Sequence, residues 1–135
     1  MASGWYKKGL EAILNGDVDF LVDDIRFVAV DTAAYTVNLS TDDFLADIAV
    51  GARIATSAAL AGKSTTLGVF DATDHTIATV AGASFEAVVF YKHTGVDATA
   101  ILLVYVDQGT GLPYTPNNGN IDFVFDNGAN KIAAL

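Results

Sequence analysis

The sequence predicts a mainly β protein: an antiparallel β-sandwich-like domain with a short N-terminal helix and room for one further short helix. Two apolar runs, at residues 85–91 and 100–106, are rich in β-branched and aromatic side chains and flank a polar segment broken by Gly95. This pattern is typical of a β-hairpin. Polar and apolar residues do not alternate strictly in either run, so both faces of these strands should be covered. We expect them at the centre of a two-layer β structure, or in a sheet whose second face meets another subunit.

The chain of 135 residues is expected to form a single β-rich domain with a sizeable core. Residues 1–24 should form a docking segment, made of the N-terminal helix and an acidic loop, and residues 25–135 should form the β core. No internal repeat or linker divides the chain.

Residues 5–15 are the best helix candidate, because Leu10, Ile13 and Leu14 recur at helical spacing. Gly9 lowers the helix propensity of this short piece, so it needs a surface to dock on. The remaining elements are expected in this order: strand 25–30, extended segment 35–39, short helix 42–48, strand 53–56, strand 64–70, strand 75–80, the hairpin 85–106, strand 121–125, a turn at 126–128 and a last strand at 131–135.

Composition argues for an interface. Hydrophobic residues make up 52% of the chain and charged residues 17%, against about 45–50% and about 25% in ordinary soluble domains. A small domain has limited interior, so part of the surplus apolar surface should be covered by neighbouring molecules. We therefore expect an oligomer or a subunit of a larger assembly.

The charge balance excludes several classes of partner. Sixteen acidic and seven basic residues give a net charge of −9, which repels phosphate and argues against nucleic acid or an anionic membrane as partner. No uncharged apolar run approaches the roughly 20 residues that span a bilayer, and no signal peptide is expected. The absence of cysteine excludes disulfides and thiolate metal sites.

Two stretches resemble ligand-binding motifs and are expected to be structural instead. Residues 62–64 contain the Gly-Lys-Ser of a phosphate-binding loop, but Ser57 stands where the motif needs its first glycine. The carboxylates of the acidic loop could attract a hard cation, yet the EF-hand spacing is missing and such charge blocks are usually solvated. The acidic loop contains Asp17, Asp19, Asp23 and Asp24.

No catalytic centre is expected. Asp71 and Asp74 could pair for acid–base chemistry, but aspartates in turns commonly bond their own backbone. His75 and His93 are the only histidines and are expected to be ordinary surface or edge residues. A Gly-x-Ser-x-Gly elbow is absent, and we expect no catalytic, cofactor-binding or metal-binding residue.

Several short motifs, in their order along almost the whole chain, resemble a family of small virion structural proteins of tailed bacteriophages. The motifs are WYKKGL at 5–10, GDVDF at 16–20, LAGK at 60–63, FDATD at 70–74, VVFYKHTG at 88–95, GLP at 111–113 and FVFDNG at 123–128. None is a catalytic signature, and it is their order that carries the likeness. The resemblance implies a β-rich, non-enzymatic subunit of the particle, either a capsid decoration (cement) protein or a head–tail or tail adaptor.

The expected function is therefore that of a decoration or cement protein that stabilises the shell through apolar and strand-edge contacts. Its partners would be other copies of itself and major capsid or neck and tail proteins, and it would reside in the virion after assembly in the bacterial cytoplasm. A β-sandwich module that binds carbohydrate or a receptor is the alternative, since exposed aromatic side chains suit such ligands. The interface candidates are Trp5, Tyr6, Leu10, Leu112, Tyr114 and Leu135.

Overall fold

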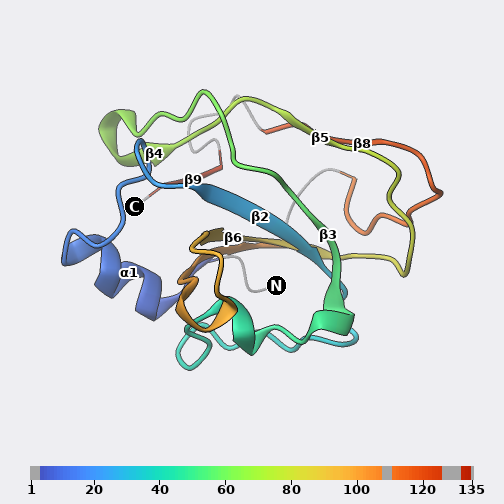
Figure 1. Cartoon of the computed structure of the whole chain (residues 1–135), viewed down its shortest axis with the longest axis horizontal. Helices are drawn as coiled ribbons and strands as arrows, with labels where there is room; N and C mark the ends of the chain where they lie inside the picture. The colour runs from blue at the N-terminus through green and yellow to red at the C-terminus, as the bar shows by residue number, and fades with distance from the viewer. Residues whose placement is uncertain (1–3, 108–110, 126–131, 135) are drawn as a thin grey trace.

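The computed structural model describes residues 4–107, 111–125 and 132–134. It confirms a mainly β fold, built on a five-stranded antiparallel sheet in the order β1-β7-β6-β2-β3 (Figure 1). The strands of the sheet are β1 (Gly4–Trp5), β2 (Ile25–Val30), β3 (Arg53–Thr56), β6 (Ala87–Lys92) and β7 (Leu102–Val106). The predicted hairpin is β6 and β7, and β6 lies at the centre of the sheet.

The continuous apolar runs of the central strands divide between two faces. In β6, Val89 and Tyr91 belong to one core cluster, and Val88 and Phe90 to another. This follows from the two-residue period of a strand, which sends successive side chains to opposite faces. The prediction that both faces are covered is confirmed, and the covering comes from the chain itself.

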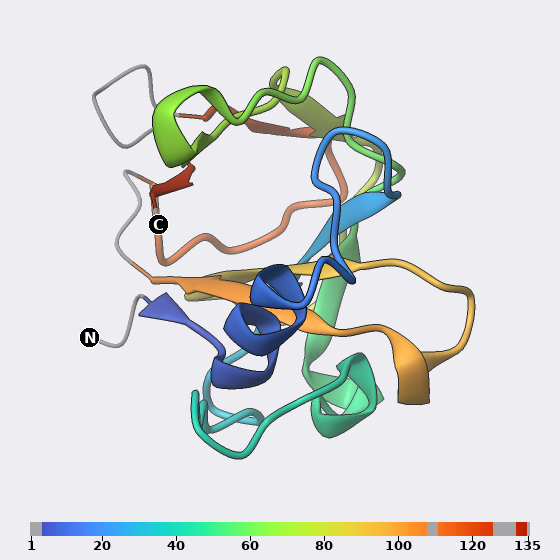
Figure 2. The same ribbon diagram turned by 90° about the vertical axis from the view of Figure 1, so that its left-hand side faces the viewer.

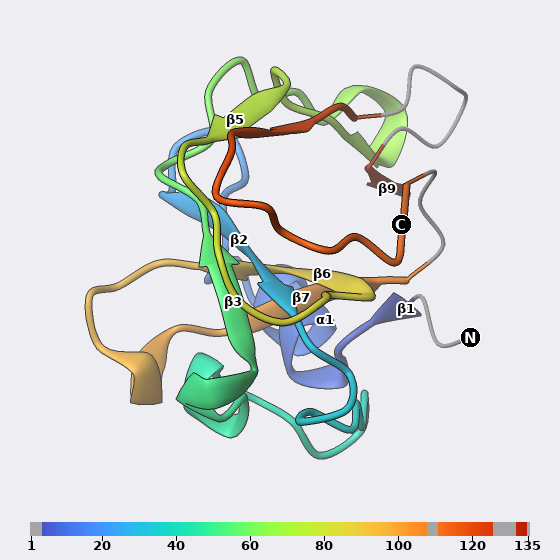
Figure 3. The same cartoon turned by 90° about the vertical axis from the view of Figure 1, so that its right-hand side faces the viewer.

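Two short ribbons cover one face of the sheet, where a continuous second sheet would complete a sandwich. One ribbon pairs β4 (Val69–Phe70) with β9 (Ala133–Ala134), and the other pairs β5 (His75–Ile77) with β8 (Ile121–Phe123). Figure 3 shows both ribbons above the main sheet. Aromatic side chains fill the space between, since Phe27 of β2 lies 4.7 Å from Phe123 and 5.7 Å from Phe90, centroid to centroid.

Irregular chain from residues 35–52 covers the other face (Figure 2). Tyr35, Leu45 and Ile48 from this layer are buried against the sheet. The layer includes the 3-10 turns η1 (Leu45–Asp47) and η2 (Val50–Ala52). The expected second helix at 42–48 is therefore a single 3-10 turn, because Phe44 pairs with Ile101 and interrupts any helix before it can begin.

Several expected elements differ in extent, among them the strand expected at 121–125, which ends at Phe123. The strand expected at 64–70 is mostly a turn: η3 (Thr66–Gly68) fills its middle, and Leu67 has a φ of 56° and is 97% exposed. Segment 35–39 forms no strand in the described chain. The strand expected at 75–80 ends at Ile77. The turn at 126–128 and the ends of the last strand, residues 131 and 135, lie outside the described residues.

The N-terminal helix forms, but it packs through a face that was not expected. It is α1 (Lys7–Leu14), and its buried residues are Gly9 and Ala12. Leu14 is 85% exposed. A Cβ atom on Gly9 would lie 2.5 Å from the carbonyl oxygen of Leu102, so the missing side chain lets the helix backbone lie directly on β7.

Candidate functional site

The structure separates the predicted interface residues. Tyr6 is wholly buried, so it is removed from the surface candidates. Its hydroxyl lies 2.9 Å from that of Tyr35, which donates to Asp42 at 2.7 Å. Leu135 lies outside the described residues. The remaining candidates, Trp5, Leu10, Leu112 and Tyr114, are partly exposed.

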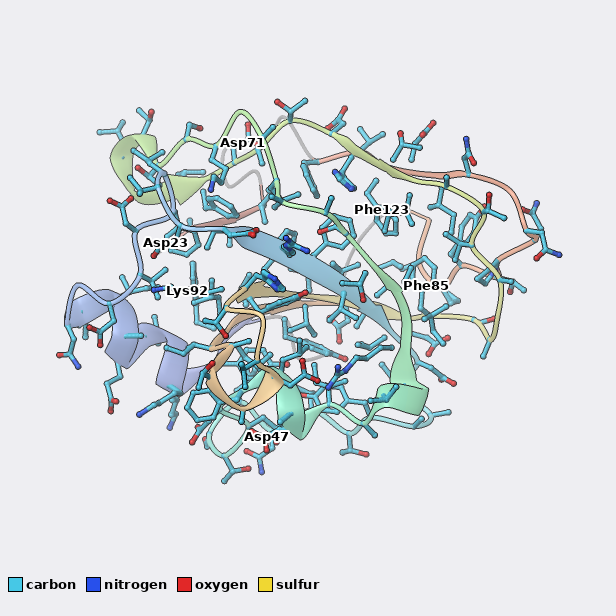
Figure 4. All side chains as sticks on the ribbon, viewed as in Figure 1. Asp23, Asp47, Asp71, Phe85, Lys92 and Phe123 are labelled. Carbon is cyan, nitrogen blue, oxygen red and sulfur yellow. The ribbon has the colours of Figure 1, made fainter. Side chains whose placement is uncertain are left out.

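The four partly exposed candidates do not form one surface patch. Trp5 donates its indole N–H to the carbonyl of Ala134 at 2.9 Å and packs with the cluster on the ribbon face. Tyr114 stacks on Phe85 at 5.6 Å. Phe85 in turn stacks on Phe123 (Figure 4). These aromatic side chains therefore serve mainly to hold the chain's own layers together.

Exposed apolar side chains are concentrated instead at the end of α1 and in the loop after it. Among the described residues, seven large apolar side chains are exposed, and three of them fall within residues 14–22. These are Leu14, Leu21 and Val22, exposed by 85%, 54% and 79%. Isolated exposed apolar residues are ordinary, but three in nine residues support the expectation that this segment docks on a partner.

The acidic loop is held by its own backbone and by lysines. Asp19 accepts from the amides of Leu21 and Val22 at 2.9 and 3.3 Å. Asp23 accepts from the amide of Asp19 at 2.8 Å and pairs with Lys92 at 3.3 Å (Figure 4). The bond from the Asp19 amide, together with Lys92, lowers the pKa of Asp23.

Lys63 of the Gly-Lys-Ser stretch donates to the backbone carbonyl of Asp23. Gly62 has a φ of 61° and lies close to the Thr73 side chain. The backbone amide of Thr73 donates to the carbonyl oxygen of Ala61 at 2.8 Å. The stretch is thus a tight turn whose lysine anchors the acidic loop. This agrees with the structural interpretation of the motif.

The candidate catalytic carboxylates have structural partners. Asp74 accepts from the amide of Phe125 at 2.9 Å, and Asp71 bridges to Ser64 through its backbone. The His75 ring lies 5.7 Å from that of Phe27. Within the described part of the chain, no group of three or more His, Cys, Asp or Glu side chains is placed to hold a metal ion.

A polar cleft of about 210 Å³ opens on the face covered by residues 35–52. The register of the sheet explains it: Arg26 of β2 lies opposite Tyr91 of β6, and Thr56 of β3 lies opposite Val28. These positions share one face of the sheet, and the turns η1 and η4 (Asp97–Thr99) form the walls. His93, at the end of β6, also lines the cleft.

Both arginines of the chain, Arg26 and Arg53, line this cleft. Arg53 is held rigidly: it donates to the carbonyls of Leu45 and Ile48 at 2.7–3.0 Å and, through Nη1, to Asp97 at 2.8 Å. Arg26 binds Asp24 through Nε and Nη2 at 3.0 and 2.9 Å. That bond lowers the pKa of Asp24 and raises the pKa of Arg26.

No known protein family matches the chain, and no curated protein does. The cleft residues were not anticipated from the sequence. One signal was present: an acidic chain has only two arginines, and both fall on expected strands, at 25–30 and 53–56. The register that brings them to one face could not be derived from their positions. In the described residues, no helix has the length and apolar character needed to cross a membrane.

Proposed function

We propose that this protein is a non-enzymatic structural subunit of a tailed-bacteriophage particle, with a capsid decoration role placed before a head–tail or tail adaptor role. The order of short motifs along almost the whole chain supports the particle class. A mainly β domain is what that class implies. The acidic character suits a position away from packaged DNA, because like charge repels the phosphate backbone.

The observation that carries the proposal furthest lies within the docking segment expected at residues 1–24: the end of α1 and the loop after it, residues 14–22, carry exposed apolar side chains. Figure 1 shows this segment at the outer edge of the molecule, beside the start of β2. Its three exposed apolar side chains would be buried against the shell or a neighbouring copy, at about 25 cal/mol per Å² of apolar surface. The hydrogen bonds within the acidic loop and its bonds to Lys63 and Lys92 hold this segment in place before it docks.

The direct test is localisation on particles. An antibody raised against the purified protein would be applied to intact tailed particles whose genome encodes this chain. The labelled particles would then be examined by immunogold electron microscopy. Regular labelling over the head would support the decoration role, and labelling confined to the neck or tail the adaptor role. Particles that carry no label, with all of the protein in the unassembled fraction, would refute both roles.

A matched set of variants tests the docking segment. Leu14→Lys and Val22→Lys place a charge on the proposed surface, whereas Leu67→Lys places the same charge at a side chain that is 97% exposed on another turn. We expect all three to fold, and only the first two to be lost from particles in a co-sedimentation assay. Equal retention of all three would place the docking surface elsewhere.

A further inference from the structure

The cleft between β2, β3 and β6 offers hydrogen-bond donors that the protein does not use. Asp24 occupies Nε and Nη2 of Arg26, which leaves both hydrogens of Nη1 without an acceptor among the described residues. A guanidinium carries five N–H donors in a rigid fork, so one edge of this fork makes no hydrogen bond to the described chain.

Tyr91 is a second and independent sign of a binding site. Its side chain is buried, with 2% exposed, and its hydroxyl has no hydrogen-bond partner in the described chain. No buried side-chain oxygen or nitrogen there is left without a partner, so this hydroxyl must reach the solvent of the cleft. Burial raises the pKa of this hydroxyl, and Arg26 and Arg53 act in the opposite direction, so both guanidinium groups, which line the same cleft, lie near it.

We propose that this cleft binds a single carboxylate group through Arg26, the Tyr91 hydroxyl and Nη1 of Arg53. The carboxylate can come from an acidic side chain of a partner protein or from a small organic acid. Both sources present the same planar pair of oxygens, which the free edge of a guanidinium matches in two parallel bonds. This inference goes beyond the particle role and does not depend on it.

Charge decides between a carboxylate and a phosphate. Arg26 and Arg53 are already paired with Asp24 and Asp97, so the four groups sum to zero formal charge. A monoanion brings the cleft to −1, whereas a dianion brings it to −2 on a chain whose net charge is already −9. The cleft therefore favours a group with one charge and several acceptor lone pairs.

The ion pair between Arg53 and Asp97 allows the exchange that binding requires. The Asp97 side chain is 52% exposed, whereas that of Arg53 is only 15% exposed and is held by two backbone carbonyls. Because the Asp97 carboxylate is half exposed and Arg53 keeps its carbonyl partners, an incoming carboxylate can displace Asp97 while Arg53 stays in position.

The experiment is a titration of the ¹⁵N-labelled full chain followed by NMR, with sodium acetate as the probe and sodium chloride at matched ionic strength as the reference. Acetamide has the same shape without the charge and serves as the second reference. We expect saturable shifts of the Arg26 side-chain Nε–H and of the backbone amides of Thr56 and His93 with acetate, and none with either reference. Unsaturable shifts, or equal shifts with acetamide, would overturn the proposal.

Variants locate the binding in the cleft. Tyr91→Phe should weaken acetate binding by about tenfold or more, the usual effect of one lost hydrogen bond to a charged group. Tyr105→Phe is the matched control, because Tyr105 is buried on the same face of the sheet but does not line the cleft. Arg26→Lys keeps the charge and removes the fork, and it should weaken binding further. Wild-type affinity in Tyr91→Phe, or equal losses in both tyrosine variants, would refute the assignment.

A blocked peptide, acetyl-Gly-Glu-Gly-amide, distinguishes the two sources. Tighter binding than acetate would support an acidic side chain of a protein partner as the natural ligand. Binding equal to that of acetate would support a small organic acid, since the peptide backbone would then make no contact of its own.

Discussion

Replacement of Gly9 by alanine should destabilise the protein, against the ordinary effect of this substitution. In the middle of an exposed helix, alanine is more favourable than glycine by about 1 kcal/mol. In α1, however, the new Cβ would lie 2.5 Å from the Leu102 carbonyl oxygen and 3.0 Å from the Leu103 Cα. Both are backbone atoms of β7, so neither can rotate away and the helix itself must move.

Overpacking costs about 1–3 kcal/mol, and contacts this short with backbone atoms belong to the upper part of that range, above the gain in helix propensity. We expect the free energy of unfolding to fall by about 1 kcal/mol or more, and the midpoint in urea to fall by roughly 0.5–1 M at an unchanged slope. Gly51→Ala is the control, because no atom lies within 4 Å of a Cβ at that position. Urea unfolding followed by tryptophan fluorescence would measure both variants, since Trp5 lies next to the helix. A Gly9→Ala variant as stable as the wild type would show that α1 does not rest on β7 as described.

Four further outcomes are expected. Val89→Asp, at a fully buried position of the central strand, should abolish folding because an unpaired charge enters the core. Its control, Val96→Asp, changes a side chain that is 58% exposed and should give soluble protein with native circular dichroism. A folded Val89→Asp variant would show that β6 is not central. Tyr35→Phe should lower the free energy of unfolding by about 1–3 kcal/mol, because it leaves the Tyr6 hydroxyl buried without its partner, and an unchanged urea midpoint would contradict this. Burial raises the pKa of Tyr6 above its ordinary value of 10.0, so the folded state holds the hydroxyl proton more tightly than the unfolded state does. The free energy of unfolding should therefore be unchanged below pH 10 and fall as the pH rises above it. Thermal melts between pH 8 and 12 would detect this loss. The hydrogen bond from Arg26 lowers the pKa of Asp24 below 3.8, so the contribution of this ion pair to stability should be present above pH 3.8 and be lost as the pH falls below it. An Asp24→Asn variant should lose less stability on acidification than the wild type.

Much of the β core could be predicted from local pattern. Strand β2 coincides with the expected 25–30 and β3 with 53–56. The absence of alternation in 85–91 correctly indicated a sheet covered on both faces. The predictions failed where a tertiary contact opposed the local preference. The pairing of Phe44 with Ile101 leaves only one 3-10 turn of the helix expected at 42–48, and the positive φ of Leu67 ends the strand expected at 64–70.

The site could be predicted only in part. A docking segment was expected in residues 1–24; the exposed Leu14, Leu21 and Val22 fall within that range, and their contact with a partner stays a prediction. Tyr6 was named as an interface candidate, but its ring is buried in the core and its hydroxyl is hydrogen-bonded to that of Tyr35. The residues of the cleft were missed because Arg26 and Arg53 come to line one cleft only through the pairing of β2 with β3.

The sequence by itself determined that this chain is a mainly β domain, with Val, Ile and Phe in runs that demand cover on both sides of a sheet. It also determined the net negative charge, because charge depends on composition alone. Only the tertiary structure decided what provides that cover, which face of α1 packs, and which side chains meet in the cleft. The physical reason is that periodicity specifies the direction of a side chain relative to its own strand or helix, whereas contacts between distant segments depend on register and on how closely two backbones can approach.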